Sequence, residues 1–390
     1  MGMGKQPRSK KMKSIVRRAN AFWSDPDAFQ TLCNDLGPGP FASVVFYATP
    51  RVDFFQLGQD AQKKFGAAII VGCTTAGEIT DQGYDQDQIV AIGFPESHFE
   101  TEAVLVEHLE FVDIDRVLDK IVQNRRNLKE LHPRWEFEFN HLLIDGLSTK
   151  EDEFVSKISL SLGPVPLFGG SAADGIDFKQ TRILHQTQVY SNAAVLLQFR
   201  TKCPIQVFKT DHLVPSKNHM VVTGADPENR IVTELNAEPA AREYARILGK
   251  DPEQLTPFTF AAHPVVVREG GQHHVRAIQR VADNGDLIFF SAIDEGLVLT
   301  LAEPMDMSEH LKEELENLSA RQAPDIIWAC DCILRRLEAQ EKQMITKLSN
   351  LMVEKNVIGF STYGEQFNSM HVNQTLTGVA IYPPAEEEDA

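Results

Sequence analysis

Three loops of this chain repeat one set of residue types that could hydrogen-bond a small polar ligand. They span residues 72–78, 169–175 and 359–365, and each follows a short apolar run. Each combines glycine with alanine, serine or threonine, and two of them end in Gly-Glu. Small residues let a backbone approach a ligand or another backbone closely, and glycine adopts dihedral angles that other residues resist. We therefore expect the loops to build either one binding site or one pseudo-symmetric scaffold.

The polar side chains of these loops, and of the segment after the third loop, are the candidate ligand-pocket residues. A glutamate could pair with an amine of the ligand, or it could accept a hydrogen bond from a neighbouring backbone amide. The hydroxyl groups could bind the ligand or only cap turns. The predicted pocket consists of Cys73, Thr74, Thr75, Gly77, Glu78, Ser171, Thr362, Tyr363, Glu365 and Gln374.

Four residues outside the loops could hold a cofactor. His371, His212 and His263 are candidates in that order, because a buried neutral imidazole beside methionine and aromatic residues can be an axial haem ligand. A histidine that only fills the core has the same surroundings. Arg276 could hold a carboxylate or propionate through two hydrogen bonds, or it could be a solvated strand residue beside Asp283.

Familiar catalytic signatures are absent from the sequence. It contains no phosphate-binding loop, complete dinucleotide fingerprint, nucleophile elbow or zinc-protease helix, so we expect a protein that is not an enzyme. A hydrolase that uses Cys73 or Cys332 is the least favoured alternative. The five cysteines have no metal-finger or disulfide-framework spacing, which favours a reducing cytoplasm, although Cys330 or Cys332 could be a thiolate ligand.

Composition limits the classes of partner. The 390 residues are 43% apolar and 24% charged, which is ordinary for a globular protein of two or three domains. A formal net charge of −17 argues against general binding to nucleic acid or to anionic membranes. No apolar run approaches membrane-spanning length, and no signal peptide follows the basic segment 5–18. We expect a cytoplasmic protein that could form a homo-oligomer.

The loops must be held by layers of helix and sheet. The N-terminal half alternates predicted helices and strands, whereas strands crowd together from residue 192 onward, with a hairpin turn at Asn284-Gly285. We predict a strand over 258–267 and one helix over 334–352. The expected fold class is mixed α/β, with two domains of mixed sheets layered with helices and an internal pseudo-repeat.

These motifs together resemble those of the FIST family of bacterial sensory modules, over most of the chain from Ala42 to Tyr382. The resemblance implies a FIST N-like domain at 21–205 and a FIST C-like domain at 206–382. A flexible basic N-terminus at 1–20 and a disordered acidic tail at 383–390 would flank them. The motifs that carry it lie at residues 71–79, 168–174, 222–225, 234–240, 359–366 and 373–375.

Within the family the chain resembles most the stand-alone NosP-type proteins, because of its closing run at 363–375. That resemblance implies a haem b cofactor with His371 on the iron, nitric oxide as the ligand, and a histidine kinase as the regulated partner. The rival hypothesis is a FIST module that binds a small polar metabolite, such as an amino acid, between the threonine-rich loops and Arg276.

Overall fold

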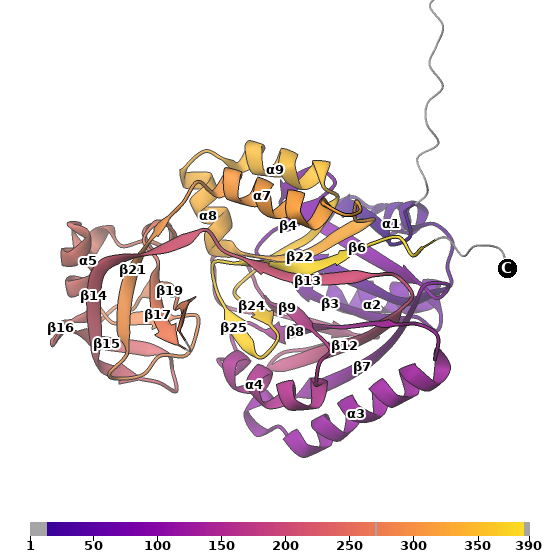
Figure 1. The fold of residues 1–390 in the computed structure, drawn as a ribbon, viewed down its shortest axis with the longest axis horizontal. Coiled ribbons are helices and arrows are strands. Elements are labelled where there is room, and N and C mark those ends of the chain that lie inside the picture. Colours follow the sequence, from indigo (N-terminus) through magenta and orange to yellow (C-terminus); the bar gives the residue numbers. More distant parts are fainter. Residues whose placement is uncertain (1–13, 270, 386–390) are drawn as a thin grey trace, which may run out of the picture.

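The computed structural model describes residues 14–269 and 271–385, which form a core of three six-stranded sheets and a smaller β-rich lobe beside it (Figure 1). In the first sheet, β2 and β3 are parallel and β6 runs antiparallel to β2. Its order is β1 (Arg17–Phe22), β6 (Gln88–Pro95), β2 (Phe41–Ala48), β3 (Ile69–Thr74), β10 (Ile183–His185) and β11 (Gln188–Tyr190).

The second and third sheets repeat this arrangement strand for strand. In each, two central strands are parallel and their neighbour is antiparallel. The second sheet has the order β7 (Phe99–Glu107), β12 (Ala193–Thr201), β8 (Phe137–Asp145), β9 (Leu167–Ala172), β24 (Glu365–Phe367) and β25 (Met370–Val372). The third has the order β13 (Ile205–Thr210), β26 (Leu376–Ile381), β22 (Ile326–Cys332), β23 (Val357–Thr362), β4 (Glu78–Thr80) and β5 (Gly83–Asp85).

Each repeat donates a hairpin to another repeat's sheet. The chain runs through two parallel strands joined by helix, leaves to form a hairpin at the edge of another sheet, and returns as the antiparallel strand. The hairpin β4–β5 of the first repeat joins the third sheet, β10–β11 of the second joins the first, and β24–β25 of the third joins the second. This cyclic exchange confirms the predicted internal pseudo-repeat.

Helices cover the outer faces of the three sheets (Figure 1). Aspartate side chains cap several of them, as Asp53 does for α2 and Asp306 for α7 by accepting backbone N–H groups. The core helices are α1 (Ala28–Leu36), α2 (Phe54–Phe65), η1 (Leu109–Phe111), α3 (Ile114–Leu131), α4 (Glu151–Leu162), α7 (Met307–Ser319), α8 (Ile333–Glu341) and α9 (Ile345–Glu354).

The three sheets enclose one apolar centre to which every repeat contributes. Within it, the indole N–H of Trp328 donates to the hydroxyl of Tyr47 at 2.9 Å, and that hydroxyl lies 2.8 Å from Nε2 of His141. These three residues come from β22, β2 and β8, and all are fully buried. Desolvation lowers the pKa of His141 to about 3, so its ring is neutral and the chain of hydrogen bonds helps fix the three sheets in one arrangement.

The smaller lobe is an insertion in the third repeat, between β13 and α7 (left in Figure 1). Its hydrophobic cluster is separate from the core's. Its strands are β14 (Leu213–Asp226), β15 (Ile231–Leu235), β16 (Glu238–Pro239), β17 (Val265–Glu269), β18 (Gln272–Val275), β19 (Ile278–Val281), β20 (Leu287–Phe289) and β21 (Val298–Pro304), and its helices are α5 (Ala240–Leu248), η2 (Pro252–Gln254) and α6 (Pro257–Ala262).

Three local predictions are wrong. Residues 257–262 form helix α6 instead of a strand, because Thr256 and Thr259 make a reciprocal capping box. The helix predicted over 334–352 is two helices, broken at Gln343, which has a φ of 55°. Residues 17–20, within the segment predicted to be flexible, belong to β1, and Ser14 donates to Asp325; residues 1–13 and 386–390 lie outside the described part of the chain.

Candidate functional site

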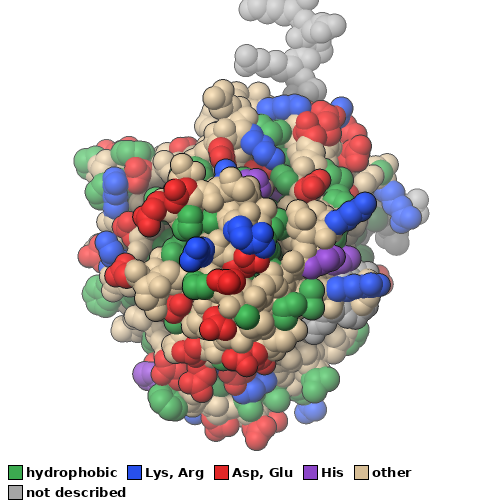
Figure 2. All heavy atoms as spheres, turned by 90° about the vertical axis from the view of Figure 1, so that its left-hand side faces the viewer, with side chains coloured by type: hydrophobic (Ala, Val, Ile, Leu, Met, Phe, Trp, Pro, Cys, Tyr) green, Lys and Arg blue, Asp and Glu red, His purple; other side chains and the backbone are tan. Residues whose placement is uncertain are grey.

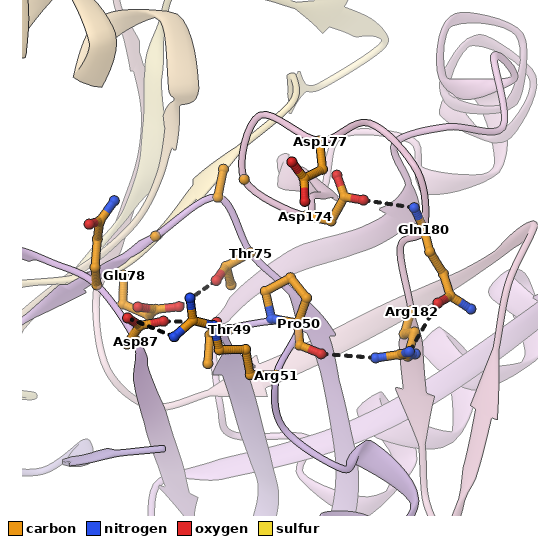
Figure 3. Close-up of a pocket in the computed structure, with 14 residues that line it drawn as sticks. Thr49, Pro50, Arg51, Thr75, Glu78, Asp87, Asp174, Asp177, Gln180 and Arg182 are labelled. Atoms are coloured by element: carbon orange, nitrogen blue, oxygen red, sulfur yellow. Dashed lines mark hydrogen bonds and ion pairs between the residues drawn. The ribbon is translucent and has the colours of Figure 1, made fainter. Parts of the chain in front are cut away.

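A cleft of about 430 Å³ opens at the carboxyl ends of the parallel strands β2 and β3 (Figure 3). That volume lies within the range of small-molecule sites, and the carboxyl end of parallel strands is where open α/β sheets bind ligands. Its walls come from segments 49–51, 75–78, 86–87 and part of 174–182. The last segment belongs to the second repeat and arrives here because β10 pairs with β3.

Two arginine side chains line the cleft, and the protein holds one of them more firmly than the other. Arg182 donates from Nη1 to the carbonyl of Pro50 and from Nη2 to Oε1 of Gln180, both at 3.0 Å (Figure 3). Arg51 makes a 3.4 Å contact with the carboxylate of Asp87, and its side chain is 61% exposed. Arg182 therefore braces the wall, whereas Arg51, which also lies over the ring of Trp23 at 5.8 Å from its centre, is the more exposed cation at the cleft.

Aspartate side chains also line the cleft, and two of them, Asp174 and Asp177, lie on the loop that precedes β10 (Figure 3). Asp174 accepts the backbone N–H groups of residues 178, 179 and 180 and also the hydroxyl of Tyr363. Its role is therefore to shape the loop. Asp87 and Asp177 supply the negative charge that faces the opening.

Glu78 lies under the floor of the cleft and exposes no surface. Its carboxyl group accepts the hydroxyl of Thr75 at 2.5 Å and the backbone N–H of Gln88 at 3.1 Å. Desolvation raises the pKa of Glu78 to about 7, and the two hydrogen bonds and Arg336 oppose that rise. Its charge therefore changes near neutral pH.

The three small-residue loops meet one another and form a ring of backbone hydrogen bonds, so they build a scaffold. In each loop the fifth residue donates its N–H to the carbonyl of the third residue of another loop. The bonds are Ala76 to Ser361 at 2.9 Å, Ala173 to Thr74 at 2.9 Å and Tyr363 to Ser171 at 3.4 Å.

Two glycines of the loops are required by close neighbours. Gly77 has φ of +125°, and a Cβ there would collide with the guanidinium of Arg336. A Cβ at Gly364 would collide with the imidazole of His371. The first glycine borders the cleft and the second is sealed inside the third repeat, so we expect ligand effects at Gly77 alone.

Three of the predicted pocket residues, Thr75, Gly77 and Glu78, line the cleft. The other seven are buried within the loop ring and the third repeat. Glu365 accepts the N–H and hydroxyl of Thr375 at 3.2 and 2.7 Å, and Gln374 donates to the carbonyl of Ala261 at 2.8 Å. These seven are Cys73, Thr74, Ser171, Thr362, Tyr363, Glu365 and Gln374.

His212 uses both of its ring nitrogens for protein contacts. Arg335 donates to Nδ1 at 3.0 Å, and Nε2 lies 3.0 Å from a carboxylate oxygen of Glu338. Because a guanidinium can only donate, Nδ1 is the acceptor and Nε2 carries the proton. Desolvation lowers the pKa of His212, and no nitrogen lone pair is left for a metal.

The other proposed cofactor residues do not line the cleft, although desolvation lowers the pKa of His371 and Arg276 lies near enough for its charge to help lower it. His371 lies in β25, with Nδ1 3.2 Å from Nε2 of Gln366 and its ring against Gly364. His263 ends helix α6 of the lobe. Arg276 follows β18, and its backbone N–H donates to Val265 at 2.9 Å.

This arrangement does not fit a haem site. The three histidines lie on separate elements, His212 has no free lone pair, and the ring of His371 is packed against backbone at Gly364. Among the described residues, no group of three or more His, Cys, Asp or Glu side chains is arranged to hold a metal ion.

The sequence did not single out the polar residues that face the opening, Arg51, Asp87, Asp177 and Arg182. One signal could have found Arg51, which lies three residues beyond the apolar run 43–48, at the end where parallel sheets bind ligands. Arg182 carries no such signal, because it reaches the first repeat only through the hairpin exchange.

Comparison with known families gives two matches. The FIST N domain matches residues 42–238 and the FIST C domain matches residues 240–368. No curated protein matches the chain. Within residues 14–269 and 271–385, none of the helices has the length and apolar character needed to cross a membrane.

Proposed function

The chain belongs to the FIST family of sensory, small-ligand-binding signalling modules, and we propose that it senses a small zwitterion, such as an amino acid, in the cleft of the first repeat. One observation carries the proposal: an exposed arginine and carboxylates face the same cleft of about 430 Å³. A molecule with both an ammonium and a carboxylate group matches that pairing of charges.

Each end of such a ligand has a partner in the cleft. The guanidinium of Arg51 can leave its 3.4 Å contact with Asp87 and hold the ligand carboxylate through two hydrogen bonds. Asp87, released from Arg51, and Asp177 then face the ammonium group. The hydroxyl of Thr49, 3.4 Å from Asp87, completes the polar wall.

Calorimetric titration with a panel of the common amino acids tests this function. We expect at least one to bind, and Arg51→Ala to weaken its binding about tenfold or more, because a hydrogen-bonded charge is lost. Arg126→Ala, at an exposed arginine on α3, is the matched control and should bind as the wild type does. If no amino acid binds, or if both variants bind equally, the cleft is not an amino-acid site.

Haem-based sensing of nitric oxide is the second candidate. One observation favours it: Nε2 of His371 is buried and has no hydrogen-bond partner in the described structure. Haem would require the third repeat to open at Gly364, since the residues do not fit it as arranged. Absorption spectra with added hemin decide this, because a sharp Soret band that nitric oxide shifts would support haem and a protein that stays colourless would exclude it.

Control of a histidine kinase is the proposed output. Figure 2 shows carboxylate side chains spread over the face that carries the lobe, with hydrophobic side chains in small separate groups. Together with a net charge of −17, this favours a partner with a basic surface and an association that weakens as salt rises. Autophosphorylation of a candidate kinase, measured with and without the protein and its ligand, should then differ; equal rates would exclude that kinase.

A further inference from the structure

Three charged side chains of helix α8 are buried in the protein interior. Arg335, Arg336 and Glu338 are 1%, 5% and 0% exposed. Arginine and glutamate are almost never buried so deeply unless each is paired. Their partners lie in two directions, so α8 contacts both the cleft and the lobe.

Toward the cleft, Arg336 holds the backbone of the first loop and its hairpin. Nη2 donates to the carbonyl of Asp85 at 2.7 Å, and Nη1 lies 3.5 Å from the carbonyl of Glu78. The guanidinium also stacks over the ring of Tyr84, 5.4 Å from its centre, and fills the space beside Gly77. A ligand that moves this loop must therefore move the side chain of Arg336.

Toward the lobe, Arg335 and Glu338 hold His212 from both sides, at 3.0 Å each. Asp331 accepts from Nε of Arg335 at 2.8 Å and from the hydroxyl of Tyr84 at 2.5 Å. The hydrogen-bonded network thus runs without a break from the hairpin of the first repeat, through α8, to His212.

His212 stands where both connections of the lobe meet the core. The chain enters the lobe at Leu213, which pairs with Pro304 on the way out. The carbonyl of His212 accepts the N–H of Met305 at 2.7 Å. The network therefore ends on the two strands about which the lobe would turn.

Apolar packing follows the same path. Leu334 and Leu337 of α8 belong to one buried cluster with Ala261 and Val266 of the lobe and with Ala76 of the first loop. Since packed interfaces change between discrete arrangements and do not deform smoothly, a shift of α8 changes how the lobe sits.

We propose that α8 couples the cleft to the lobe: Arg336 reports the position of the first loop, and the Arg335–His212–Glu338 contacts set the position of the lobe. This regulation rests on the proposed function only in that the cleft is the ligand site. The coupling itself is a property of the folded chain, so it can be measured without ligand.

Hydrogen exchange of the full-length protein tests the coupling. Arg336→Met should speed amide exchange about fivefold or more at the lobe connections, residues 211–213 and 303–306, as well as in the first loop. Arg182→Met is the matched control, because it removes an arginine that also braces the cleft through a backbone carbonyl but lies outside α8. It should speed exchange in the cleft and leave the connections unchanged.

The reverse experiment uses the reciprocity of coupled sites. His212→Leu should speed exchange in residues 75–86, whereas His212→Gln, which can still accept from Arg335 and donate to Glu338, should restore it. Equal effects of Arg336→Met and Arg182→Met at the connections, or no effect of His212→Leu on the first loop, would overturn the proposal. Neither result depends on whether an amino acid binds, so failure here is distinct from failure of the proposed function.

Discussion

The first and third repeats carry a glutamate at the same place, yet only the first serves an open cleft. Glu78 and Glu365 each lie six residues after the glycine that pairs with the neighbouring parallel strand, Gly72 and Gly359. Both accept a backbone N–H from just before or at the start of the returning strand. The scaffold is therefore the same in both repeats, and the difference lies in what covers it.

The covering element is the lobe together with α8. Arg51 and Leu334 occupy matching positions, five residues after Phe46 and Ala329, which pair with the two glycines. Leu334 is buried in the cluster shared with the lobe, whereas the Arg51 side chain is 61% exposed. An insertion in one repeat thus covers the end of that repeat and leaves the corresponding end of the first repeat open.

Replacing Leu334 of the third repeat by arginine, the residue at the matching position of the first repeat, should have the largest effect on stability. Leu334→Arg buries a guanidinium that has no carboxylate partner in the shared cluster, and we expect it to lower the free energy of unfolding by about 3–5 kcal/mol. Chemical denaturation measures this. Leu334→Met, which keeps the volume, should cost less than about 1.5 kcal/mol. Equal losses for the two variants would mean that packing, and not charge, seals the third repeat.

Glu78 and Glu365 should both make the stability depend on pH, but only the contribution of Glu78 should respond to a ligand in the cleft. The pKa of Glu78 rises from 4.5 unfolded to about 7 folded, so the unfolded chain loses this proton first and stability falls between those pH values. At about 1.4 kcal/mol per pKa unit the contribution is at most about 3.5 kcal/mol. The stability of Glu78→Gln relative to the wild type should therefore increase over that window, as pH-dependent denaturation can measure.

Glu365→Gln supplies the comparison within the same experiment. Desolvation raises the pKa of Glu365 well above its usual value, so the direction of the pH dependence is the same. An amino acid bound in the cleft should shift the pH range over which Glu78 affects the stability, and it should leave the corresponding pH range of Glu365 unchanged. A ligand that shifted both would contradict the view that only the first repeat is open.

The sequence predicted the repeat because its signal is local. Small residues after an apolar run, as at 72–78, are visible without knowing any partner. The exchange of hairpins could not be predicted, because three-residue strands such as β10 carry no preference for one sheet edge over another. Tertiary pairing decides that choice, and with it the place of Arg182.

The contrast between local sequence signals and tertiary pairing also explains which residues of the candidate site the sequence could indicate. Thr75, Gly77 and Glu78 lie in a recurring loop and line the cleft, whereas Thr362 and Glu365 of the third repeat, which the sequence predicts to join them, are buried. Nothing in the local pattern of 359–365 reveals that an insertion distant in sequence covers it. Burial of Glu365 is a property of the assembled fold, which residue types alone do not specify.

The smallest effect on stability should come from the opposite exchange, Arg51→Leu, which places the third repeat's residue in the first. Arg51 is largely exposed and its contact with Asp87 is long, so the free energy of unfolding should change by less than about 1 kcal/mol. Binding of the amino acid should nevertheless fall about tenfold or more, because leucine offers no hydrogen bond to a carboxylate. Thermal melts and titrations on one preparation separate the two effects. A large loss of stability with unchanged affinity would mean that Arg51 supports the fold, as Leu334 does in the third repeat, and does not bind the ligand.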